Sequence, residues 1–355
     1  MHSHLKNKFK ISMAAYINQN HDDIDQIINH LPFSFDGQRV LITGVAGFLG
    51  SWLAESILAM GGKVTGIDNF ASGTIQAVEH LQSVGKDQFT FLHHDISKPI
   101  EFSSPVDCVM HLASRASPFE FVPYPIQIMK SNTLGTMNAL GIAKRHGAQF
   151  LFTSTSEIYG EAQIFPTPET YRGNVNTLGI RGCYDEAKRA GEALCMAYFR
   201  QHEIDIRIAR IFNTYGPRMR ADGLYGRVIP RFMDQALHER SITIFGDGTQ
   251  TRSFCYVTDQ IEGLLRLCAI PAARGEVINI GNPVEITIRE LADMIVQLTG
   301  SASSYVFEPM PPDDPTRRVP DITKARELLE WSPRVSLKEG LCRVCDALQC
   351  SGETG

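Results

Sequence analysis

Two side chains four residues apart, Tyr184 and Lys188, could carry out proton transfer. They open a helical pattern over residues 184–201. Because residues four apart share one face of a helix, both side chains point the same way. An ammonium beside a phenol favours the phenolate, which lowers the pKa of the tyrosine and makes it a usable base. The pair is a candidate proton acceptor with its activator, although the same spacing also occurs in ordinary surface pairs.

A run of hydroxyls and one carboxylate upstream favours the functional interpretation. The pattern over residues 149–155 indicates a short apolar strand, and Thr155, Ser156 and Glu157 stand at its end. A buried parallel strand delivers polar groups at its carboxyl end in this way. We therefore expect these side chains to share a site with Tyr184.

Near the beginning of the chain, a strand, a glycine-rich turn and a helix form the pattern of a mononucleotide-binding unit. The strand is expected at Gln38–Thr43 and the helix at Ser51–Met60, with Gly44, Gly47 and Gly50 between them. Glycines let the backbone approach a pyrophosphate, which then lies at the helix N-terminus. The spacing is G-x-x-G-x-x-G, and a glycine triplet alone is weak evidence.

The next strand strengthens this interpretation. Lys63–Asp68 ends in a carboxylate 18 residues beyond Gly50, and no arginine follows directly. Such a carboxylate accepts hydrogen bonds from ribose hydroxyls and repels a 2′-phosphate, which favours NAD over NADP. An ordinary surface aspartate is the alternative. Asp95 and Ile96, at the end of the following strand, are placed to meet an adenine.

Strands alternate with helices through the first 211 residues. Further strands are expected at Phe89–Asp95, Val106–Ser114 and Asp205–Ile211, and a long helix at Gln127–His146. This alternation predicts an α/β fold built on a Rossmann-type doubly wound parallel sheet, with a smaller mixed C-terminal substrate-binding domain.

The expected domain bounds follow from these patterns. An NAD-binding domain is expected at residues 36–215 and about 247–282, and a smaller domain at residues 216–246 and 283–345, for which the family resemblance given below implies nucleotide-sugar binding. Residues 1–35 form an N-terminal extension, in which Asp22–His30 is patterned as a short amphipathic helix that could pack on a partner subunit. Residues 346–355 form a tail.

Five arginines lie within 35 residues of one another in the second half of the chain: Arg218, Arg220, Arg227, Arg231 and Arg252. Guanidinium groups suit phosphate oxygens. If a nicotinamide cofactor occupies the glycine turn, a second phosphate-bearing ligand is the natural partner for this group. A solvated charged face is the alternative for any single arginine.

Several longer blocks carry a resemblance to a known family. They include STSEIYG at 154–160, ARIFNTYGPRM at 209–219 and RVPDI at 318–322. With the Y-x-x-x-K pair they resemble an extended short-chain dehydrogenase/reductase, and within that superfamily the UDP-glucuronate decarboxylases, also called UDP-xylose synthases. The match runs from about Arg39 to Gly340. The first and last of these blocks are far more restrictive than the Y-x-x-x-K pair, which is superfamily-wide.

The resemblance implies a role for each matching residue. Thr155, Tyr184 and Lys188 would be the redox machinery, Glu157 would act as an acid or base on the sugar, and Arg318 would meet its carboxylate, although the sequence alone does not choose between Arg317 and Arg318. The substrate would be held by Lys130, Thr155, Glu157, Asn213, Arg227, Ile229, Arg252 and Arg318. NAD would be held by Gly44, Gly47, Phe48, Leu49, Gly50, Asp68, Asn69, Phe70, Ser72, Gly73, Asp95, Ile96, Leu112, Ser114, Ser131, Thr153, Tyr184, Lys188 and Thr214.

The implied reaction is oxidation of UDP-glucuronate at C4, loss of carbon dioxide from the 4-keto acid, and reduction to UDP-xylose. A UDP-glucuronate 4-epimerase, which uses the same ketone without losing carbon dioxide, is the alternative. Two departures from the family pattern bear on it: Arg115 stands where proline is usual and Arg172 where tryptophan is usual. Both could retain the carboxylate. The loop after Met219 is also about two residues longer than typical, through Leu224 and Tyr225.

Less favoured alternatives remain. A 4,6-dehydratase would be expected to show Asp-Glu where Ser156-Glu157 stands. A synthase that releases the 4-ketopentose keeps the same machinery. A non-catalytic NAD-binding scaffold of the same fold could lose Tyr184 or Lys188, and both are present.

Composition excludes several other classes of function. The net charge is −5 with no basic tract, so nucleic acid is not expected as a partner. No apolar run reaches the roughly 18 residues that span a bilayer, and the N-terminus lacks an apolar signal-peptide core. The eight cysteines are scattered, with one C-x-x-C at Cys342–Cys345. We therefore expect a cytoplasmic protein with reduced thiols. We expect no metal site at His93, His94 and His111, because neighbouring strand residues face opposite sides of a sheet.

The superfamily resemblance also implies an oligomeric state. The long helical patterns over 127–146 and 184–201 correspond to helices that pair across a two-fold axis in this superfamily. The second is rich in alanine, which suits close approach. A homodimer through a four-helix contact is therefore expected.

Overall fold

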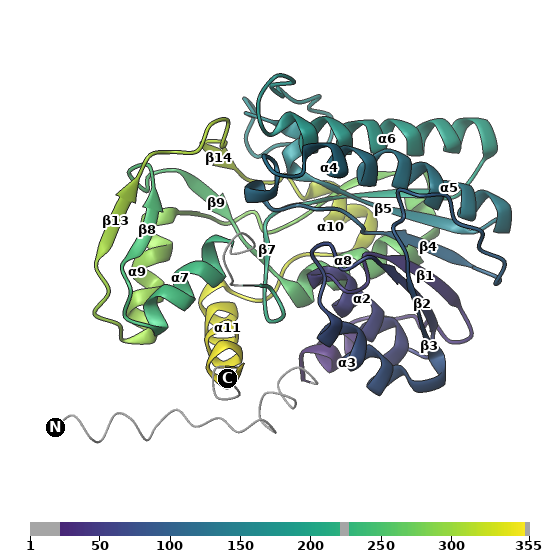
Figure 1. Cartoon of the computed structure of the whole chain (residues 1–355), viewed down its shortest axis with the longest axis horizontal. Coiled ribbons are helices and arrows are strands. Elements are labelled where there is room, and N and C mark those ends of the chain that lie inside the picture. The colour runs from purple at the N-terminus through teal and green to yellow at the C-terminus, as the bar shows by residue number, and fades with distance from the viewer. Residues whose placement is uncertain (1–21, 221–226, 352–355) are drawn as a thin grey trace.

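The computed structural model describes residues 22–220 and 227–351 of the chain. Its centre is a seven-stranded parallel sheet with the strand order β11-β6-β5-β4-β1-β2-β3 (Figure 1). The strands are β1 (Arg39–Thr43), β2 (Lys63–Asp68), β3 (Phe89–His93), β4 (Cys108–His111), β5 (Gln149–Thr155), β6 (Ile206–Ile211) and β11 (Val277–Ile280). This is the Rossmann-type sheet that the alternation of strands and helices predicts.

Successive residues of the central strands are buried on opposite faces of the sheet. In β1, Val40 and Ile42 join one apolar cluster and Leu41 the other. The first cluster packs against α2 (Phe48–Ala59), α3 (Ile75–Gly85) and α8 (Val257–Ala269), and the second against α5 (Leu134–His146) and α6 (Gly182–His202). Burial on both faces explains why these strands are continuous apolar runs.

The order of the strands reverses between β1 and β4, so the connections that leave their carboxyl ends run in opposite directions. In doubly wound sheets a crevice opens at this switch, and ligands bind there. The glycine turn follows β1, and Thr155 ends β5, so both candidate sites lie at this edge of the sheet.

The helix expected at 127–146 is two helices. A single residue, Thr133, separates α4 (Pro125–Asn132) from α5, and it has φ −111° and ψ −70°. The Asn132, Thr133 and Thr136 side chains each donate to a carbonyl four residues back, at 2.9, 2.7 and 2.7 Å. Such side-chain bonds compete with the helical ladder and bend helices, which the apolar periodicity does not reveal.

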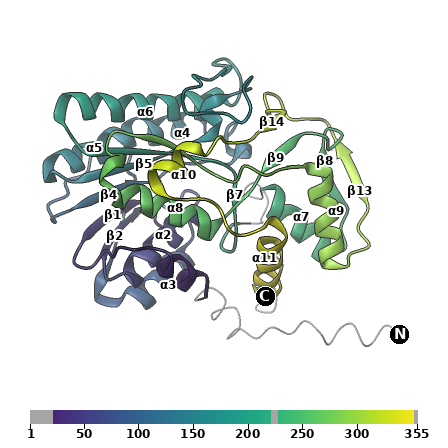
Figure 2. The same ribbon diagram turned by 180° about the vertical axis from the view of Figure 1, so that it is seen from behind.

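A second, smaller layer completes the molecule beside the sheet (Figure 1). It contains α7 (Val228–Leu237), α9 (Ile288–Thr299), a three-stranded sheet of order β12-β9-β14 and the pair β13-β8. Its strands are β8 (Ile242–Phe245), β9 (Thr251–Ser253), β12 (Glu285–Thr287), β13 (Tyr305–Glu308) and β14 (Arg317–Arg318), and a short parallel pair, β7 (Thr214–Tyr215) with β10 (Cys255–Tyr256), lies nearby. Seen from behind, α10 (Thr323–Leu329) lies beside α8, and α11 (Leu337–Ser351) lies between the two layers (Figure 2).

The N-terminal segment packs on the chain's own core. Residues 22–29 are helical, and Ile24, Ile27 and Phe35 are buried in the larger apolar cluster. Asp23 accepts a hydrogen bond of 2.9 Å from the Tyr256 hydroxyl. The described part of this segment is therefore an integral element, where the sequence suggested an appendage.

Leu224 and Tyr225, in the longer loop, lie outside the described residues. Among the described helices, none has the length and apolarity that crossing a bilayer requires. His111 is buried and lies 2.7 Å from the Thr43 hydroxyl, and no group of three or more His, Cys, Asp or Glu side chains within the described ranges could hold a metal ion.

Candidate active site

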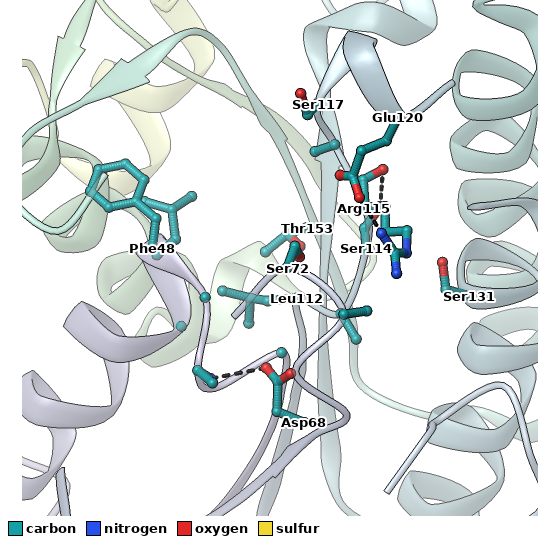
Figure 3. A pocket seen from close by; sticks show the side chains of 18 of the residues that line it. Phe48, Asp68, Ser72, Leu112, Ser114, Arg115, Ser117, Glu120, Ser131 and Thr153 are labelled. Atoms are coloured by element: carbon teal, nitrogen blue, oxygen red, sulfur yellow. Dashed lines mark hydrogen bonds and ion pairs between the residues drawn. The ribbon is translucent and has the colours of Figure 1, made fainter. Parts of the chain in front are cut away.

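A cavity of about 1170 Å³ opens at the carboxyl ends of the central strands. Residues from the glycine turn, from the ends of β2, β5 and β6, from the segment that follows β4 and from the first two turns of α6 line it. Figure 3 shows Phe48 and Asp68 on one side of it and Arg115, Glu120 and Ser131 on the opposite side. One cavity therefore joins the two candidate sites.

The glycine turn forms a tight cradle at one end of this cavity. Gly44 has φ +76°, and a Cβ on Gly50 would lie 2.1 Å from the Gly44 carbonyl oxygen. Gly47 is the N-cap of α2, and Phe48, Leu49 and Gly50 line the cavity in the first turn. No described side chain caps this helix, so its first amides face the cavity. Main-chain amides at a helix N-terminus bind a pyrophosphate in this geometry, which fits NAD.

Asp68 is held beside the cradle by backbone amides. Its Oδ2 accepts from the Ala46 amide at 3.0 Å and its Oδ1 from the Phe70 amide at 2.8 Å. Burial raises the pKa of Asp68, and these hydrogen bonds act in the opposite direction. The side chain lines the cavity, so a carboxylate is available to ribose hydroxyls there.

Most of the residues expected to bind NAD line the cavity. Besides those already named, they are Asn69, Ser72, Asp95, Ile96, Leu112, Ser114, Ser131, Thr153 and Thr214. Phe70 and Gly73 do not. The Phe70 ring packs on Phe91 and His93 at 5.3 and 5.5 Å, and a Cβ on Gly73 would lie 2.7 Å from the Ala46 Cβ. These two residues shape the wall from behind.

Tyr184 lines the cavity from the first turn of α6. Its ring stacks on Phe121, with centroids 5.3 Å apart and an angle of 17° between the planes. Its hydroxyl is hydrogen-bonded to the Thr155 side chain. The Lys188 Nζ donates to the Thr153 carbonyl at 2.7 Å and lies 6.0 Å from the Tyr184 ring centroid.

The pKa values at this centre correct one expectation. Burial raises the pKa of Tyr184 to about 12, while Arg227 and the Thr155 hydrogen bond act to lower it. Lys188 is not among the groups that shift this pKa most, and burial lowers its own pKa to about 7. The helical spacing placed the two side chains correctly, but it did not predict that burial dominates the charge of both.

A dense ionic cluster forms the wall beyond Tyr184. Glu157 Oε2 accepts from Arg181 and, at 3.1 Å, from Arg318. Burial would raise the pKa of Glu157, but Arg318, Arg181 and Arg252 outweigh it and lower this pKa to about 2. Glu157 is therefore an anion at neutral pH.

The residues expected to bind substrate fall into two groups. Lys130, Thr155, Glu157, Asn213 and Arg227 line the cavity. Arg252, Arg318 and Ile229 do not. Arg318 is buried and pairs with Glu157, and the partly buried Arg252 pairs with Asp314 at 2.8 Å. Ile229 faces the apolar core from α7.

The structure separates Arg317 from Arg318. Arg317 is exposed, pairs with Glu285 at the surface and lies 4.6 Å from the Phe165 ring centroid. Arg318 is 2% exposed and also donates to the Ser156 carbonyl. Because neighbouring strand residues face opposite sides, only Arg318 faces the site.

Sequence reasoning missed Arg181 and Phe121. Arg181 lines the cavity and contacts Glu157, and Phe121 stacks on Tyr184. A signal for Arg181 existed, because it stands three residues before Tyr184 and therefore on the same face of the helix. Phe121 lies in a loop, where periodicity carries no information.

The two departures from the family pattern have different surroundings. Arg115 lines the cavity, but its guanidinium pairs with the buried Glu120 and lies 4.4 Å from the Tyr124 ring centroid. Arg172 is exposed and lies outside the cavity lining, and its carbonyl accepts from Arg189 at 2.7 Å. The charge of Arg115 is therefore paired, and the charge of Arg172 lies outside the cavity lining.

Comparison with known proteins agrees with this geometry. The family described as "NAD dependent epimerase/dehydratase family" matches residues 40–281. The chain belongs to this family, within the extended short-chain dehydrogenases/reductases.

The particular group within that family is the UDP-glucuronic acid decarboxylases. UDP-glucuronic acid decarboxylase 2 of Arabidopsis thaliana is 48% identical over 308 residues, which cover 86% of this chain and 67% of the relative. UDP-glucuronic acid decarboxylase 1 of Danio rerio is 46% identical over 306 residues, covering 86% and 71%. UDP-glucuronic acid decarboxylase 5 of Arabidopsis thaliana is 46% identical and covers 87% and 89%.

Solved structures show the same architecture. UDP-glucuronic acid 4-epimerase from Bacillus cereus, in complex with UDP-glucuronic acid and NAD, has a TM-score of 0.77 at 31% identity, over 88% of this chain and 99% of that one. UDP-glucose 4-epimerase from Thermotoga maritima with UDP-glucose has a TM-score of 0.80 at 28% identity, with the same coverage.

Proposed function

We propose that this protein is an NAD-dependent decarboxylase that converts UDP-glucuronate to UDP-xylose through a UDP-4-keto intermediate. The observation that carries the proposal is the position of Tyr184. It lies in one cavity between a pyrophosphate cradle and a wall with Arg181 and Glu157, backed by Arg318. The relatives named decarboxylases align with 86 and 87% of this chain.

Tyr184 is the proton acceptor for the sugar 4-hydroxyl. Only the phenolate can accept this proton, and burial disfavours the phenolate, so positive charge and a hydrogen-bond donor nearby are needed to form it before the sugar is oxidised. Arg227 supplies charge, and Thr155 shares the hydrogen bond. NAD held by the glycine turn and Asp68 would supply the hydride acceptor for C4 and, at the end of the cycle, the hydride donor.

Oxidation at C4 places a ketone β to the C6 carboxylate. Such acids lose carbon dioxide readily, because the electrons of the broken bond collect on the enolate oxygen. Tyr184 and Thr155 are the donors for that oxygen. C5 then takes up a proton, which Glu157 can supply only once it has itself been protonated, and Tyr184 returns its proton to the 4-oxygen as C4 is reduced.

The 4-epimerase is the second candidate, and one observation favours it. The Bacillus cereus relative binds UDP-glucuronic acid and NAD on the same fold at 31% identity. An epimerase must keep the carboxylate, and the two extra arginines could have served that purpose. Arg115 is paired with Glu120 and Arg172 lies outside the cavity lining, so they lend it no support.

The mass of the product decides between these reactions. The protein is incubated with UDP-glucuronate and NAD, and the products are read by mass spectrometry. Decarboxylation lowers the mass of the sugar nucleotide by about 44 units, because carbon dioxide leaves. An unchanged mass with a new sugar configuration would establish the epimerase, and recovery of unaltered UDP-glucuronate would reject both.

The working form is a homodimer through α4, α5 and α6. Ile126, Met129, Leu134 and Met137 are large apolar side chains between 41% and 58% exposed on α4 and α5. Gly141 has open space at its Cβ position, which permits close helix approach. Sedimentation should give a dimer for the natural chain and a monomer for Met137→Glu, because a buried charge opposes association. An unchanged sedimentation coefficient in the variant would contradict this interface.

A reducing compartment, the cytoplasm, suits the cysteines. Those whose side chains the structure describes are all free thiols, five of the seven buried. Fractionation of the native host with an antibody to this chain tests the placement: recovery with membranes or in a secreted fraction would refute it.

A further inference from the structure

Arg181 is the residue that joins the acids of the ionic wall. One guanidinium nitrogen pairs with Glu157, another lies 3.3 Å from Asp314 and Nε lies 3.9 Å from Asp185. The side chain is 10% exposed, and its guanidinium carbon lies 5.7 Å from the Phe121 ring centroid. Phe121 in turn stacks on Tyr184. Arg181 is therefore held at a fixed place beside the reaction centre.

Arg318 pairs with the same acid. Its Nη2 lies 3.1 Å from Glu157 Oε2, the oxygen that Arg181 also contacts. Glu157 and Arg181 line the cavity, whereas Arg318 does not. The carboxylate of Glu157 thus occupies a site between two guanidinium groups and covers the deeper one.

A uronic sugar brings one more carboxylate to this wall. The substrate carboxylate and Glu157 would repel each other if both lay on the cavity side of Arg181 and Arg318, because like charges within about 4 to 6 Å oppose ionisation. Displacement of one by the other keeps every cation paired. Guanidinium groups bind carboxylates in a bidentate fork, so the incoming group can replace Glu157 without loss of geometry.

We propose that Arg181 is a positioning residue for the sugar carboxylate: with Arg318 it forms a two-guanidinium site, which Glu157 occupies in this structure and which the carboxylate of UDP-glucuronate takes over. The inference rests on the proposed function and adds Arg181, and an exchange of anions, to it. Glu157 turns toward the sugar when it leaves this site.

The exchange also explains how Glu157 becomes a proton donor. The two arginines are the main cause of its low pKa, and they act against its burial. A substrate carboxylate in their place removes that stabilisation of the anion and adds a like charge. Glu157 then binds a proton that the carbon left by decarboxylation can take. Once carbon dioxide has departed, the arginines are available to Glu157 again.

The test compares two ligands that differ in the carboxylate. Calorimetry on the NAD-loaded protein measures binding of UDP-glucuronate and of UDP-xylose, in a Tyr184→Phe background that prevents turnover. Arg181→Gln should weaken UDP-glucuronate by about tenfold or more, and UDP-xylose by less than about twofold. Arg181→Lys should fall between. The control is Arg317→Gln, which removes an exposed arginine one residue from Arg318 and should change neither affinity.

A second variant tests the exchange without removing a cation. Glu157→Gln removes the negative charge that occupies the two-guanidinium site. The affinity for UDP-glucuronate should therefore rise several-fold, and the affinity for UDP-xylose should not change. A weaker affinity for UDP-glucuronate in Glu157→Gln would overturn the exchange. Equal losses for the two ligands in Arg181→Gln would show that Arg181 only supports the fold, and no loss for either would remove it from the site.

These readouts are independent of the reaction product. If the natural protein epimerises UDP-glucuronate and both ligand-selective changes appear, the exchange stands and the decarboxylase proposal fails. If carbon dioxide is released but the two ligands respond alike, the decarboxylase stands and the exchange fails.

Discussion

The two ends of the cavity recognise their ligands by different means. The cofactor end is built from the backbone of one short turn, Gly44–Gly50, and a carboxylate that backbone amides hold. The sugar end is built from side chains that pair with one another across the chain, and Arg318 and Glu157 are 161 residues apart in sequence. Local geometry therefore makes one end, and long-range ion pairs make the other.

This difference predicts opposite sensitivities. A backbone cradle tolerates changes in charge but not added volume. A Cβ on Gly50, for example, would lie 2.1 Å from the Gly44 carbonyl oxygen. An ionic wall tolerates small changes in volume but not the loss of one charge, since a buried partner is then left unpaired. The predictions below test this contrast, beginning where the two ends meet.

Tyr184→Phe should lower carbon dioxide release by about 10³-fold, because general base catalysis is worth about 10² to 10⁴ and no other hydroxyl replaces it. UDP-glucuronate should still bind, as both ends of the cavity remain intact. Tyr198→Phe, on the same helix and outside the cavity lining, is the matched control and should keep full activity. Turnover within tenfold of the natural protein would exclude Tyr184 as the base.

Arg318→Gln should lower kcat/KM for UDP-glucuronate by about 100-fold, because loss of one partner of a buried charge pair costs about 2 to 5 kcal/mol. NAD affinity should not change, since Arg318 lies at the other end. Arg317→Gln should change kcat/KM by less than about twofold, as an exposed ion pair contributes about 0 to 1 kcal/mol. Similar losses in both variants would contradict the separation of the two arginines.

Gly50→Ala should weaken NAD by about tenfold or more, because overpacking of a tight contact costs about 1 to 3 kcal/mol. Equilibrium dialysis measures this affinity. In Gly141→Ala the new Cβ meets nothing within 4 Å, and helix propensity favours alanine, so NAD should bind as before. Wild-type NAD affinity in Gly50→Ala would show that the turn relaxes easily and would weaken the contrast drawn above.

Asp185→Asn should stabilise the protein, and more so at higher pH. Burial, together with Glu157, raises the pKa of Asp185 to about 8 against the action of Arg181 and Arg318. Between its ordinary pKa near 4 and about pH 8, the folded protein keeps a proton that the unfolded chain releases. The aspartate therefore lowers stability progressively as pH rises through that window.

Thermal unfolding at pH 5 and pH 8 measures this effect. The gain from Asp185→Asn should be larger at pH 8, by about 1 kcal/mol or more, since each pKa unit is worth 1.36 kcal/mol. Glu186→Gln, at the neighbouring and more exposed position, should show no such pH dependence. Equal gains at both pH values would mean that Asp185 titrates normally in the fold.

The fold and the cofactor end could be predicted because their signals are local. Strand, turn and helix around Gly44–Gly50 follow one another within 21 residues, Arg39–Ala59, and the period of the apolar residues reports both faces of the sheet. Tyr184 and Lys188 are brought together by the helix that contains them. The resemblance to a family implied roles for single residues at the sugar end, but it did not predict the contacts between them.

The amino-acid order alone thus determined the parallel sheet, the glycine cradle and the helix that carries Tyr184, since each depends on neighbours a few residues away. Only the tertiary structure decided that Arg318 rather than Arg317 faces the site, that Arg181 shares Glu157 with it, and that the helix breaks at Thr133. It also decided that burial, more than Lys188, sets the pKa of Tyr184. Ion pairing and desolvation depend on distances between segments far apart in the chain, and no local pattern encodes those distances.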